Sequence, residues 1–416
     1  MTNHRRSFDL AVVGGGVIGL ALGWRAAQRG LRVTVLERGE PGGSTSWVAA
    51  GMLAPITEAD PREEALLRLG LAGARAYPAF VTELAQASGL DPGYLRCGTL
   101  VVARDGDEAQ ALERELAMRR SLGLAVERLR ASEARRAQPS LAPSLRLALD
   151  VPGDHAVDPR SLTAALAQAL RRAGGELRTG AHGAELALLG GRRVAGVSLR
   201  GGERVDAEHV AIAAGVWSTK IKGVQPGASV PIRPVKGQIL RLHDPAGPGL
   251  LTQVLRMREG YVVPRGDGRY VVGATMEERG FDTTVTAGAV WELLRGALEL
   301  LPGLAELQLD ECSAGLRPAT PDNAPLIGPG TLPGLHWATG HHRNGVLLAP
   351  ITAEMVLTGV LGEGPDDCEL AEAFSPQRFE AAPAAGRAMA APAGAVGASV
   401  AAGAAPVGAG VAPVGG

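Results

Sequence analysis

Two stretches near the start decide the fold: Asp9-Leu10-Ala11-Val12-Val13-Gly14-Gly15-Gly16-Val17-Ile18-Gly19 and Arg32-Val33-Thr34-Val35-Leu36-Glu37. The apolar start of the first stretch predicts a strand of a buried parallel sheet. Gly14 then allows a sharp turn, Gly16 lets the backbone approach a pyrophosphate, and Gly19 lets the following helix pack closely on the strand. The N-terminus of that helix is a favourable place for phosphate groups. This order of elements predicts a dinucleotide-binding unit.

The second stretch predicts a strand that ends at Glu37, 23 positions beyond Gly14. A carboxylate at that place can accept hydrogen bonds from the hydroxyls of an adenosine ribose that carries no extra phosphate. The alternative for Glu37 is a strand end exposed to solvent. Because the glycine turn, the helix and the acidic residue occur together, the nucleotide interpretation is favoured.

The charge and cysteine content exclude several classes of protein. The 42 basic and 43 acidic residues give a net charge of −1, which does not favour nucleic acid or an anionic membrane as the main partner. The three cysteines of the 416-residue chain are widely spaced and form no C-x-x-C pair, which is typical of a reducing compartment. We therefore expect a cytoplasmic protein of two or three domains without a disulfide framework or a zinc site.

Two segments resemble targeting or membrane signals. The start, His4-Arg5-Arg6, has a twin-arginine look, but the apolar run after it contains the glycine motif, which must stay in the mature fold. Residues 381–416 contain 16 Ala, 8 Gly, 4 Pro and a single charge, Arg387. Four prolines would break a spanning helix. We therefore expect a disordered Ala/Gly/Pro-rich tail and a folded part that ends near Phe379.

Small residues and hydroxyls follow the second strand, in Gly42-Gly43-Ser44-Thr45-Ser46 and then Ala49-Ala50-Gly51-Met52. A nicotinamide enzyme has no particular need of a second segment that holds phosphate and ring here, whereas a flavin must be held along an edge of its ring. We call residues 42–52 the second cradle. A flexible surface loop would explain the glycines but not the apolar run over 49–53. The two motifs therefore indicate a flavin site.

A third motif, Thr339-Gly340-His341-His342-Arg343-Asn344-Gly345, is predicted to open a helix that ends near Leu361. A helix N-terminus aimed at the pyrimidine edge of a flavin would stabilise the negative charge that develops there on reduction. The histidine pair also suggests a metal site. Adjacent residues rarely bind one ion, and no further ligand lies at suitable spacing, so we expect no metal.

Other segments carry clear patterns of secondary structure. The pattern over 61–89 predicts a helix with a break at Tyr77-Pro78, and Asp158-Pro159 is typical of a helix start. Residues 176–212 alternate like a β-meander, and a second strand-rich block follows, with strands expected over 230–243, 252–257, 260–265 and 269–275. Since parallel-type and antiparallel-type blocks alternate along the chain, two interleaved domains are favoured over two consecutive ones.

Together these motifs resemble the FAD-dependent amine oxidases of the D-amino-acid oxidase superfamily, and within it the glycine oxidases of thiamine (thiazole) biosynthesis. The resemblance covers about residues 8–361. Arginine after the two histidines is similar to glycine oxidase, whereas sarcosine oxidases typically carry a lysine in that region and hold flavin through a cysteine that has no match here. Noncovalent FAD is implied. The further matching motifs are Ala214-Gly215-Val216-Trp217-Ser218, Pro234-Val235-Lys236-Gly237-Gln238, Gly260-Tyr261-Val262-Val263-Pro264-Arg265, Val272-Gly273-Ala274-Thr275-Met276, Gly315-Leu316-Arg317-Pro318 and Gly345-Val346-Leu347-Leu348-Ala349-Pro350.

The resemblance implies a mixed α/β fold in which a Rossmann-like FAD-binding domain is interleaved with an antiparallel-sheet substrate domain. This is the glutathione-reductase-type FAD fold in its D-amino-acid oxidase-like form. We assign residues 7–80, 150–222 and 312–366 to the FAD-binding domain. Residues 81–149 and 223–311 are assigned to the substrate-binding domain.

The same resemblance assigns the site residues. Arg317 is expected to bind the substrate carboxylate, and Tyr261 to donate a second hydrogen bond to it. Arg343 is expected at the mouth of the site and Met276 beside the ring or substrate. An arginine–carboxylate pair with two bonds is a strong anchor during hydride transfer. Tyr261 as a strand cap is the remaining alternative. The cofactor-binding candidates are Gly14, Gly16, Val17, Ile18, Gly19, Glu37, Arg38, Thr45, Ser46, Ala50, Gly51, Met52, Gly215, His341, His342, Arg343, Asn344, Gly345, Val346 and Leu347.

The implied activity is oxidation of glycine to the imine and then glyoxylate and ammonia, with oxygen reduced to hydrogen peroxide. A thiazole-pathway enzyme is the implied partner, and a homo-oligomer is an open expectation. Two rival functions remain. The same scaffold could act on sarcosine, D-proline or D-alanine or pass electrons to an acceptor other than oxygen, and the protein could be a noncatalytic flavoprotein tethered through its tail. Two residues stay ambiguous, since Arg265 could be structural and Glu259 stands where some relatives carry histidine.

Overall fold

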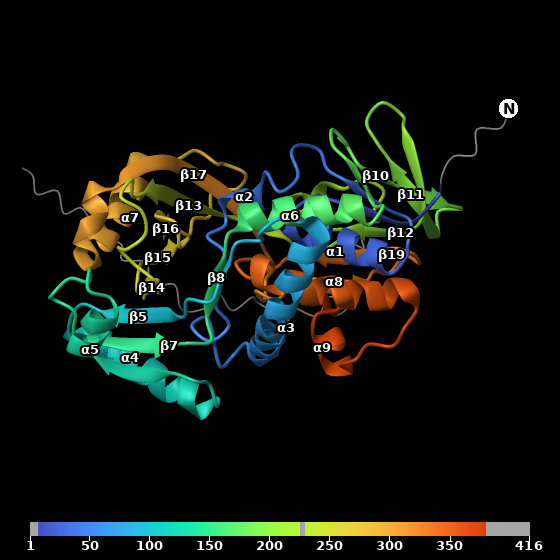
Figure 1. The fold of residues 1–416 in the computed structure, drawn as a ribbon. Helices are drawn as coiled ribbons and strands as arrows, with labels where there is room; N and C mark the ends of the chain where they lie inside the picture. Colours follow the sequence, from blue (N-terminus) through green and yellow to red (C-terminus); the bar gives the residue numbers. More distant parts are fainter. Residues whose placement is uncertain (1–6, 225–228, 380–416) are drawn as a thin grey trace, which may run out of the picture. The chain divides into compact units, whose positions relative to one another are not determined.

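The computed structural model describes residues 7–224 and 229–379, which form a mixed α/β fold around two large sheets (Figure 1). The expected fold class is therefore confirmed. The twin-arginine-like start and the tail over 381–416 lie outside the described residues. None of the described helices combines the length and the apolar character needed to span a membrane.

The first sheet is parallel at its centre. Strand β1 lies between β2 and β12 in parallel register, and β9 and β19 extend the sheet at either side. β18 pairs antiparallel with β19, and the hairpin of β10 and β11 pairs with the first half of β12. The bounds are β1 Phe8–Val13, β2 Val33–Leu36, β9 Glu176–Arg178, β10 Glu185–Leu189, β11 Arg193–Ser198, β12 Arg204–Ile212, β18 Leu326–Pro329 and β19 Leu335–Thr339.

Three helices pack against this sheet, α1 Val17–Gln28, α6 Pro159–Arg172 and α8 Gly345–Leu361, and α3 Glu64–Ser88 packs on α6 and α8. Figure 1 shows α1, α6 and α8 side by side along the sheet. Their buried faces share one apolar core, to which Leu20, Leu166 and Val356 contribute. This shared core holds α1 and α8 in place, and the first turns of both helices line one cavity, which is described below.

The second sheet has the order β17-β13-β16-β15-β14-β5-β7-β6 and is antiparallel except where β14 runs parallel to β5. Helix α7 packs on β13, β15 and β16, and α4 packs on β5 and β7. The strand bounds are β5 Thr99–Ala103, β6 Glu127–Arg130, β7 Leu147–Val151, β13 Arg233–His243, β14 Val254–Met257, β15 Gly260–Pro264, β16 Arg269–Gly273 and β17 Gln308–Ala319. The helix bounds are α4 Gly106–Ser121, α5 Ala131–Ala137 and α7 Ala287–Leu300.

Short elements join the two sheets. A third, three-stranded sheet has the order β3-β8-β4. The remaining elements are β3 Met52–Leu53, β4 Tyr94–Leu95, β8 His155–Val157, α2 Thr45–Val48, α9 Cys368–Ala373 and the 3-10 turns Gly215–Lys220, Pro302–Glu306 and Pro376–Phe379.

Several predicted elements differ from the structure. Helix α3 runs without interruption through Pro78, so the expected break is wrong. Only 185–212 forms an antiparallel meander, because β9 pairs in parallel with β2. The start over Asp158-Pro159 is confirmed, since the Asp158 carboxylate accepts a hydrogen bond of 3.0 Å from the Arg160 N–H. The proposed domain boundaries remain a prediction.

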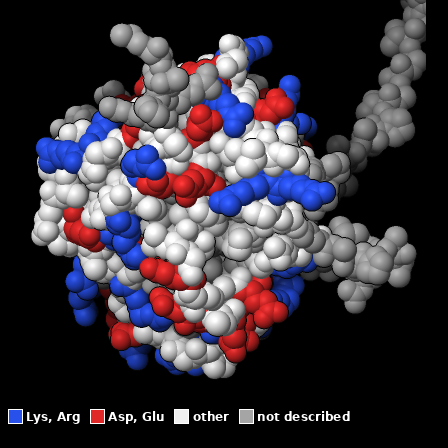
Figure 2. Space-filling model, turned by 90° about the vertical axis from the view of Figure 1, so that its right-hand side faces the viewer, with Lys and Arg blue, Asp and Glu red and all other residues white. Residues whose placement is uncertain are grey.

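Acidic and basic side chains intermingle on the face of the described residues that Figure 2 shows. Many charged side chains of the described residues form ion pairs between neighbouring elements. Arg68, for example, pairs with Asp367 at 3.1 Å and with Glu369 at 2.8 Å. The near-equal numbers of basic and acidic residues are thus matched by local ion pairs.

Candidate active site

A cavity of about 890 Å³ lies between the first and second sheets. One end is lined by the carboxyl ends of β1 and β2 and by the first turn of α1. The other end is lined by residues of β13, β14, β15 and β17 and by the first turn of α8. Ligands of open parallel sheets bind at the carboxyl ends of the strands, and this volume is typical of a small-molecule site.

The glycine turn after β1 is as tight as the sequence predicts. Gly14 has φ +111°, and a Cβ there would lie 2.5 Å from the carbonyl oxygen of Ala213. A Cβ on Gly19 would lie 1.9 Å from the carbonyl oxygen of Gly14, so only glycine lets α1 pack this closely. At Gly16 a Cβ would meet one atom, the Ser46 hydroxyl at 3.4 Å. Backbone is thus exposed to the cavity at Gly16.

Glu37 is not a solvated strand end. Its carboxylate accepts hydrogen bonds from the N–H groups of Gly15 at 2.6 Å and Gly39 at 2.9 Å. The Ser46 hydroxyl accepts a bond of 3.0 Å from the Val17 N–H, which joins the second cradle to the first turn of α1. These contacts bring the first two motifs together at one end of the cavity.

The third motif, which leads into α8, also lines the cavity. His341 is buried and shares a hydrogen bond of 2.9 Å with Thr352, while burial lowers its pKa to about 3. His342 has φ +47°, and its N–H donates to the Pro318 carbonyl at 2.9 Å. Burial and the neighbouring Arg343 lower the pKa of His342 to about 3, so its ring is neutral. Its Nε2 is buried and has no partner among the described residues.

One face of the second sheet forms the floor at the other end. Cross-strand pairs in register place Arg256, Tyr261, Gly273 and Ile239 in one row across β14, β15, β16 and β13. A Cβ on Gly273 would lie 2.6 Å from the Tyr261 hydroxyl. Paired residues in a sheet point to the same face. The Tyr261 ring therefore lies over a glycine.

Arg317 lies over a second glycine of the same face. A Cβ on Gly237 would lie 2.2 Å from its Nη1. Nη1 donates to the Thr275 carbonyl at 3.1 Å, and in the described part of the chain Arg317 forms no ion pair with a carboxylate. Burial raises the pKa of Tyr261, although the Arg317 charge acts in the opposite direction, so the phenol stays protonated. The two candidates therefore offer a cation and a neutral donor side by side.

Glu58 is a functional candidate that the sequence did not reveal. Its carboxylate forms ion pairs with Arg256 on one side and Arg343 on the other. Burial alone would raise the pKa of Glu58, but Arg256 and Arg343 outweigh it and hold that pKa at about 2. The expected strands over 252–257 and 260–265 form a hairpin with Arg256 opposite Tyr261, and that pairing could have identified Arg256.

The rim and the surroundings hold the remaining candidates. Met276 lines the cavity and is 64% exposed. Glu259 also lines it and accepts hydrogen bonds of 2.6 and 2.7 Å from Arg104. Gly19 and Leu347 do not line it, because Gly19 packs on Gly14 and Leu347 belongs to the apolar core. All other cofactor and substrate candidates line the cavity.

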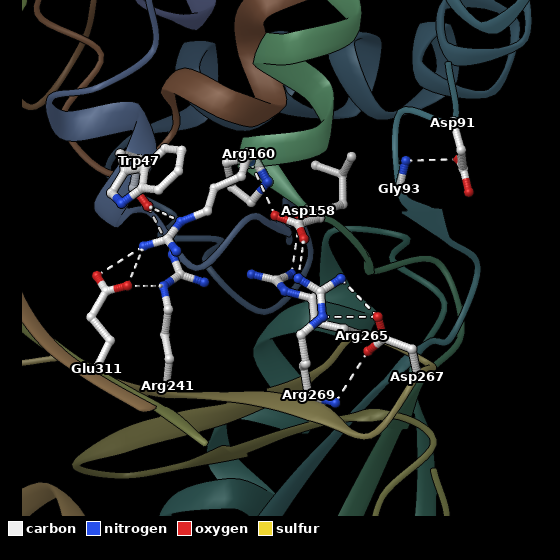
Figure 3. A network of polar contacts seen from close by, with 12 residues as sticks. Trp47, Asp91, Gly93, Asp158, Arg160, Arg241, Arg265, Asp267, Arg269 and Glu311 are labelled. Atoms are coloured by element: carbon white, nitrogen blue, oxygen red, sulfur yellow. Dashed lines mark hydrogen bonds and ion pairs between the residues drawn. The ribbon is translucent and has the colours of Figure 1, made fainter. Parts of the chain in front are cut away.

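A polar network holds the second cradle on the second sheet (Figure 3). Arg160 and Arg241 donate to the carbonyl of Trp47 at 3.2 and 2.8 Å. Arg160 also donates to both carboxylate oxygens of Glu311 at 2.8 Å, and its guanidinium stacks 3.8 Å from the Trp47 ring centroid. Strands β13 and β17 are thereby tied to α2 and α6.

Arg265 belongs to the same set of contacts. It donates to the carbonyls of Ala50 at 2.7 Å and Val157 at 3.0 Å, while Arg269 reaches Asp158 at 3.2 Å. These bonds support the structural alternative for Arg265. Among the described residues, no group of three or more His, Cys, Asp or Glu side chains is placed to hold a metal ion.

Comparison with known proteins identifies the family. The model of a family described as "FAD dependent oxidoreductase" matches residues 9–357. The chain belongs to the FAD-dependent oxidoreductases. Its sequence is 35% identical to glycine oxidase of Geobacillus kaustophilus over 364 residues, covering 85% of this chain and 92% of that one. The crystal structure of glycine oxidase from this organism superposes with a TM-score of 0.81 at 34% identity, covering 89% and 99% of the two chains.

A second relative is longer than this chain. The bifunctional protein ThiO/ThiG of Trichormus variabilis is 34% identical over 374 residues, which cover 89% of this chain and 55% of that protein. This chain therefore spans about half the length of the bifunctional relative. The predicted resemblance to the glycine oxidase group is confirmed by these matches.

The residues of this FAD-dependent oxidoreductase fit the cofactor. Gly14 and Gly16 leave room for a pyrophosphate beside the first turn of α1, and anions are stabilised at a helix N-terminus. The first turn of α8 and His342 line the same cavity, and the Nε2 of His342 has no partner among the described residues. Held by these residues, FAD would supply the hydride acceptor for the reaction. The N-terminus of α8 would stabilise negative charge that develops near it.

Proposed function

We propose that this protein oxidises glycine to glyoxylate, ammonia and hydrogen peroxide by way of the imine, with noncovalently bound FAD. One observation carries the proposal. Arg317 is without a carboxylate partner in the described structure, lies over Gly237 and stands beside the neutral Tyr261 in the cavity. A guanidinium next to a phenol is suited to bind the carboxylate of an amino acid. The glycine oxidase relative supports glycine as the substrate.

Binding and orientation are the tasks of the chain's own residues in this proposal. Arg317 binds both oxygens of the substrate carboxylate, and Tyr261 donates one further hydrogen bond. The two anchors fix the α-carbon in one position, which lowers the entropic cost of the reaction. No general base is assigned, because a substrate that enters with a neutral amine requires none.

We also propose that the imine passes to a thiazole-pathway enzyme. The support is the bifunctional ThiO/ThiG relative, in which the part similar to this chain is fused to a further segment. A cytoplasmic location remains our proposal, because Cys97, Cys312 and Cys368 are all unpaired thiols, as is typical of a reducing compartment. The oligomeric state remains an open prediction.

The first experiment is a peroxide-coupled assay of the purified yellow protein with glycine, sarcosine, D-alanine and D-proline. We expect the highest kcat/KM for glycine. A higher value for one of the others would replace glycine as the substrate but keep the oxidase. Peroxide from none of the four would exclude the oxidase and favour either an enzyme with another electron acceptor or the rival noncatalytic flavoprotein.

The second experiment concerns the flavin linkage. None of the three cysteines lines the cavity, so acid precipitation is expected to release all the yellow colour into the supernatant. Colour that stays with the pellet would show a covalent bond and overturn noncovalent binding.

A further inference from the structure

A buried polar network lies behind one wall of the cavity. Gly237 and Ile239 of β13 line the cavity, whereas their neighbours Lys236 and Gln238 are only 1% exposed and are not among the residues that line it. Successive residues of a strand point to opposite faces, so the two polar side chains lie on the far side of this wall. Burying a charged or polar group is costly unless the group is paired. Both side chains find their partners in the segment that follows β16.

This segment is fastened to β13 by backbone and side chains. Lys236 and Glu277 form an antiparallel bridge, with N–H···O bonds of 2.9 and 3.0 Å between their backbones. The Lys236 Nζ lies 2.9 Å from the Asp282 carboxylate and 3.9 Å from that of Glu277. The Gln238 Nε2 donates to the Glu277 carboxylate at 2.7 Å, and the Gln238 Oε1 accepts a bond of 2.9 Å from the Thr286 N–H. The segment therefore has little freedom to move relative to β13.

Thr275 links this network to the proposed substrate anchor. Its hydroxyl accepts a bond of 2.9 Å from the Gln238 N–H and donates one of 2.6 Å to the Glu277 carboxylate. Its own N–H donates to the Gln238 carbonyl at 3.3 Å. The Thr275 carbonyl accepts a bond of 3.1 Å from Nη1 of Arg317, and the Lys236 carbonyl accepts one of 3.5 Å from the same nitrogen. Two carbonyls of the network therefore determine where the guanidinium lies.

The Glu277 carboxylate is the centre of the network. Burial acts to raise the pKa of Glu277. Hydrogen bonds from Thr275 and Gln238 outweigh it, together with the Lys236 charge, and lower that pKa below its usual value. An ionised acceptor forms stronger hydrogen bonds than a neutral one, so at neutral pH Glu277 holds the Thr275 hydroxyl firmly. Glu277 does not line the cavity and, in the described part of the chain, pairs with Lys236 and not with Arg317. It therefore leaves the charge of the anchor available to a substrate.

We propose that Glu277 is the positioning residue of Arg317, because it fixes the Thr275 carbonyl that orients the guanidinium toward the substrate carboxylate. This inference rests on the proposed function, in which Arg317 binds that carboxylate. The remaining N–H donors of the guanidinium then face the substrate in one orientation. The preference of the site for a carboxylate thus depends on a residue that does not touch the substrate.

The experiment compares acetate with its neutral analogue acetamide on the holoenzyme, by the change that each causes in the visible flavin spectrum. We expect wild type to bind acetate more tightly. In Glu277→Ala the Kd for acetate should rise about tenfold, since a small misplacement of an anchoring group is costly. The Kd for acetamide should change less than about threefold, because a neutral ligand forms no charge-assisted bond with the guanidinium. Glu278→Ala is the matched control, since it removes an exposed carboxylate paired with Arg233, and it should change neither Kd.

Two variants of Thr275 test the route from Glu277 to the anchor. Thr275→Val removes the hydroxyl with both of its hydrogen bonds and should behave like Glu277→Ala, whereas Thr275→Ser keeps the hydroxyl and should behave like wild type. A merely structural role would lower the yield of holoenzyme without changing the ratio of the two Kd values. A Thr275→Ser variant that loses as much acetate affinity as Thr275→Val would contradict the route through the hydroxyl.

A double variant shows whether Glu277 acts through Arg317. In the Arg317→Ala background, Glu277→Ala should lower kcat/KM for glycine by less than about twofold further, because the group that it positions is gone. A full additional loss would overturn the inference, as would an unchanged acetate preference in Glu277→Ala. If Glu277→Ala loses the acetate preference but wild type yields no peroxide from glycine, the positioning role stands and the glycine assignment fails. A wild type that binds acetate no better than acetamide would contradict the anchor itself, and both proposals would fail.

Discussion

The two ends of the cavity offer different groups to a ligand, backbone at one end and side chains at the other. At the nucleotide end, backbone lies open at Gly14 and Gly16, and the first turn of α1 faces the cavity. At the substrate end, the long side chains of Arg317 and Tyr261 lie over Gly237 and Gly273. Glycine is essential at both ends for opposite reasons, because it exposes backbone at one and makes room for a neighbouring side chain at the other.

This difference determines which kind of substitution impairs binding at each end. A backbone site carries no removable group, so it is damaged by added atoms. A side-chain site is damaged by truncation, because charge and hydrogen bonds disappear together. We therefore expect substitutions at the substrate end to change catalysis while FAD stays bound, and substitutions at the nucleotide end to change FAD binding first.

The largest effect is expected at Arg317. Arg317→Ala removes a two-bonded anchor, and charge-assisted hydrogen bonds contribute about 1.5–3 kcal/mol each, so kcat/KM for glycine should fall roughly 10²–10⁴-fold. Arg317→Lys keeps the charge without the planar fork, so its kcat/KM should lie between those of wild type and Arg317→Ala. Flavin content should stay at the wild-type level in both variants. Steady-state kinetics and the visible spectrum measure the two properties.

A carboxylate-free amine provides the control for Arg317. Such a substrate is poor at the outset and should be little affected by either variant. Arg317 donates to the Thr275 carbonyl. If its role is structural, the variants should instead lose stability and flavin content and should lose kcat/KM for all substrates alike. Equal losses on glycine and on the amine would contradict the anchor role.

The next effect is on stability and depends on pH. The pKa of Glu58 is lowered from 4.5 to about 2 by Arg256 and Arg343 against the effect of burial. A lowered folded-state pKa stabilises the fold above pH about 4.5, and this stabilisation is lost as pH falls toward about 2. It corresponds to about 3 kcal/mol. The urea midpoint of Glu58→Gln should lie well below wild type near neutral pH, and the gap should narrow below pH about 4.5.

The comparison with wild type at each pH is the control for Glu58, since other carboxyl groups titrate in both proteins. A gap that stays constant from neutral pH down to pH about 2.5 would show that the Glu58 charge contributes nothing.

A smaller effect is expected at the nucleotide end. In Gly14→Ala, the added Cβ would lie 2.5 Å from the Ala213 carbonyl oxygen at a φ of +111°. Backbone strain of this kind costs about 1–3 kcal/mol, so the Kd for FAD should rise roughly 10- to 100-fold. Gly30→Ala is the matched control, because Gly30 has φ +81° but no atom within 4 Å of the added carbon. Reconstitution with FAD after acid treatment measures both, and equal Kd values would contradict the tight-turn role.

Much of the nucleotide end could be predicted because its signal is local. The strand, the glycines, α1 and Glu37 lie within 30 residues and follow fixed steric rules. The break at Pro78 was wrong because burial of Tyr77, Phe80 and Leu84 in the core favours a continuous α3 despite the lost N–H bond. Strand β17 was not predicted, since it lies at the edge of the sheet and its first half, 308–313, has a polar sequence.

The substrate end could be predicted only in part. Arg317 and Tyr261 were found through the family resemblance, whereas Glu58 and Arg256 were missed. Their ion pair joins residues 198 positions apart. Periodicity and local motifs contain no information about such distances, because the register of the second sheet and the position of the segment before α3 must both be known. The Arg256–Glu58 pair could therefore be found only in the structure.

The smallest effect tests whether a glycine positions the anchor. In Gly237→Ala, the added Cβ would lie 2.2 Å from Nη1 of Arg317 and 2.5 Å from Nη2, so the guanidinium must move. Because it is the far end of a flexible side chain, we expect FAD binding and stability to be kept and kcat/KM for glycine to fall about tenfold, since small misplacements of a positioning group reduce rates. Gly288→Ala, on α7 with no atom within 4 Å of the added carbon, should leave kinetics unchanged. If Gly237→Ala behaves like Gly288→Ala, Arg317 reaches the substrate from another position, and the substrate end depends less on its glycines than the nucleotide end does.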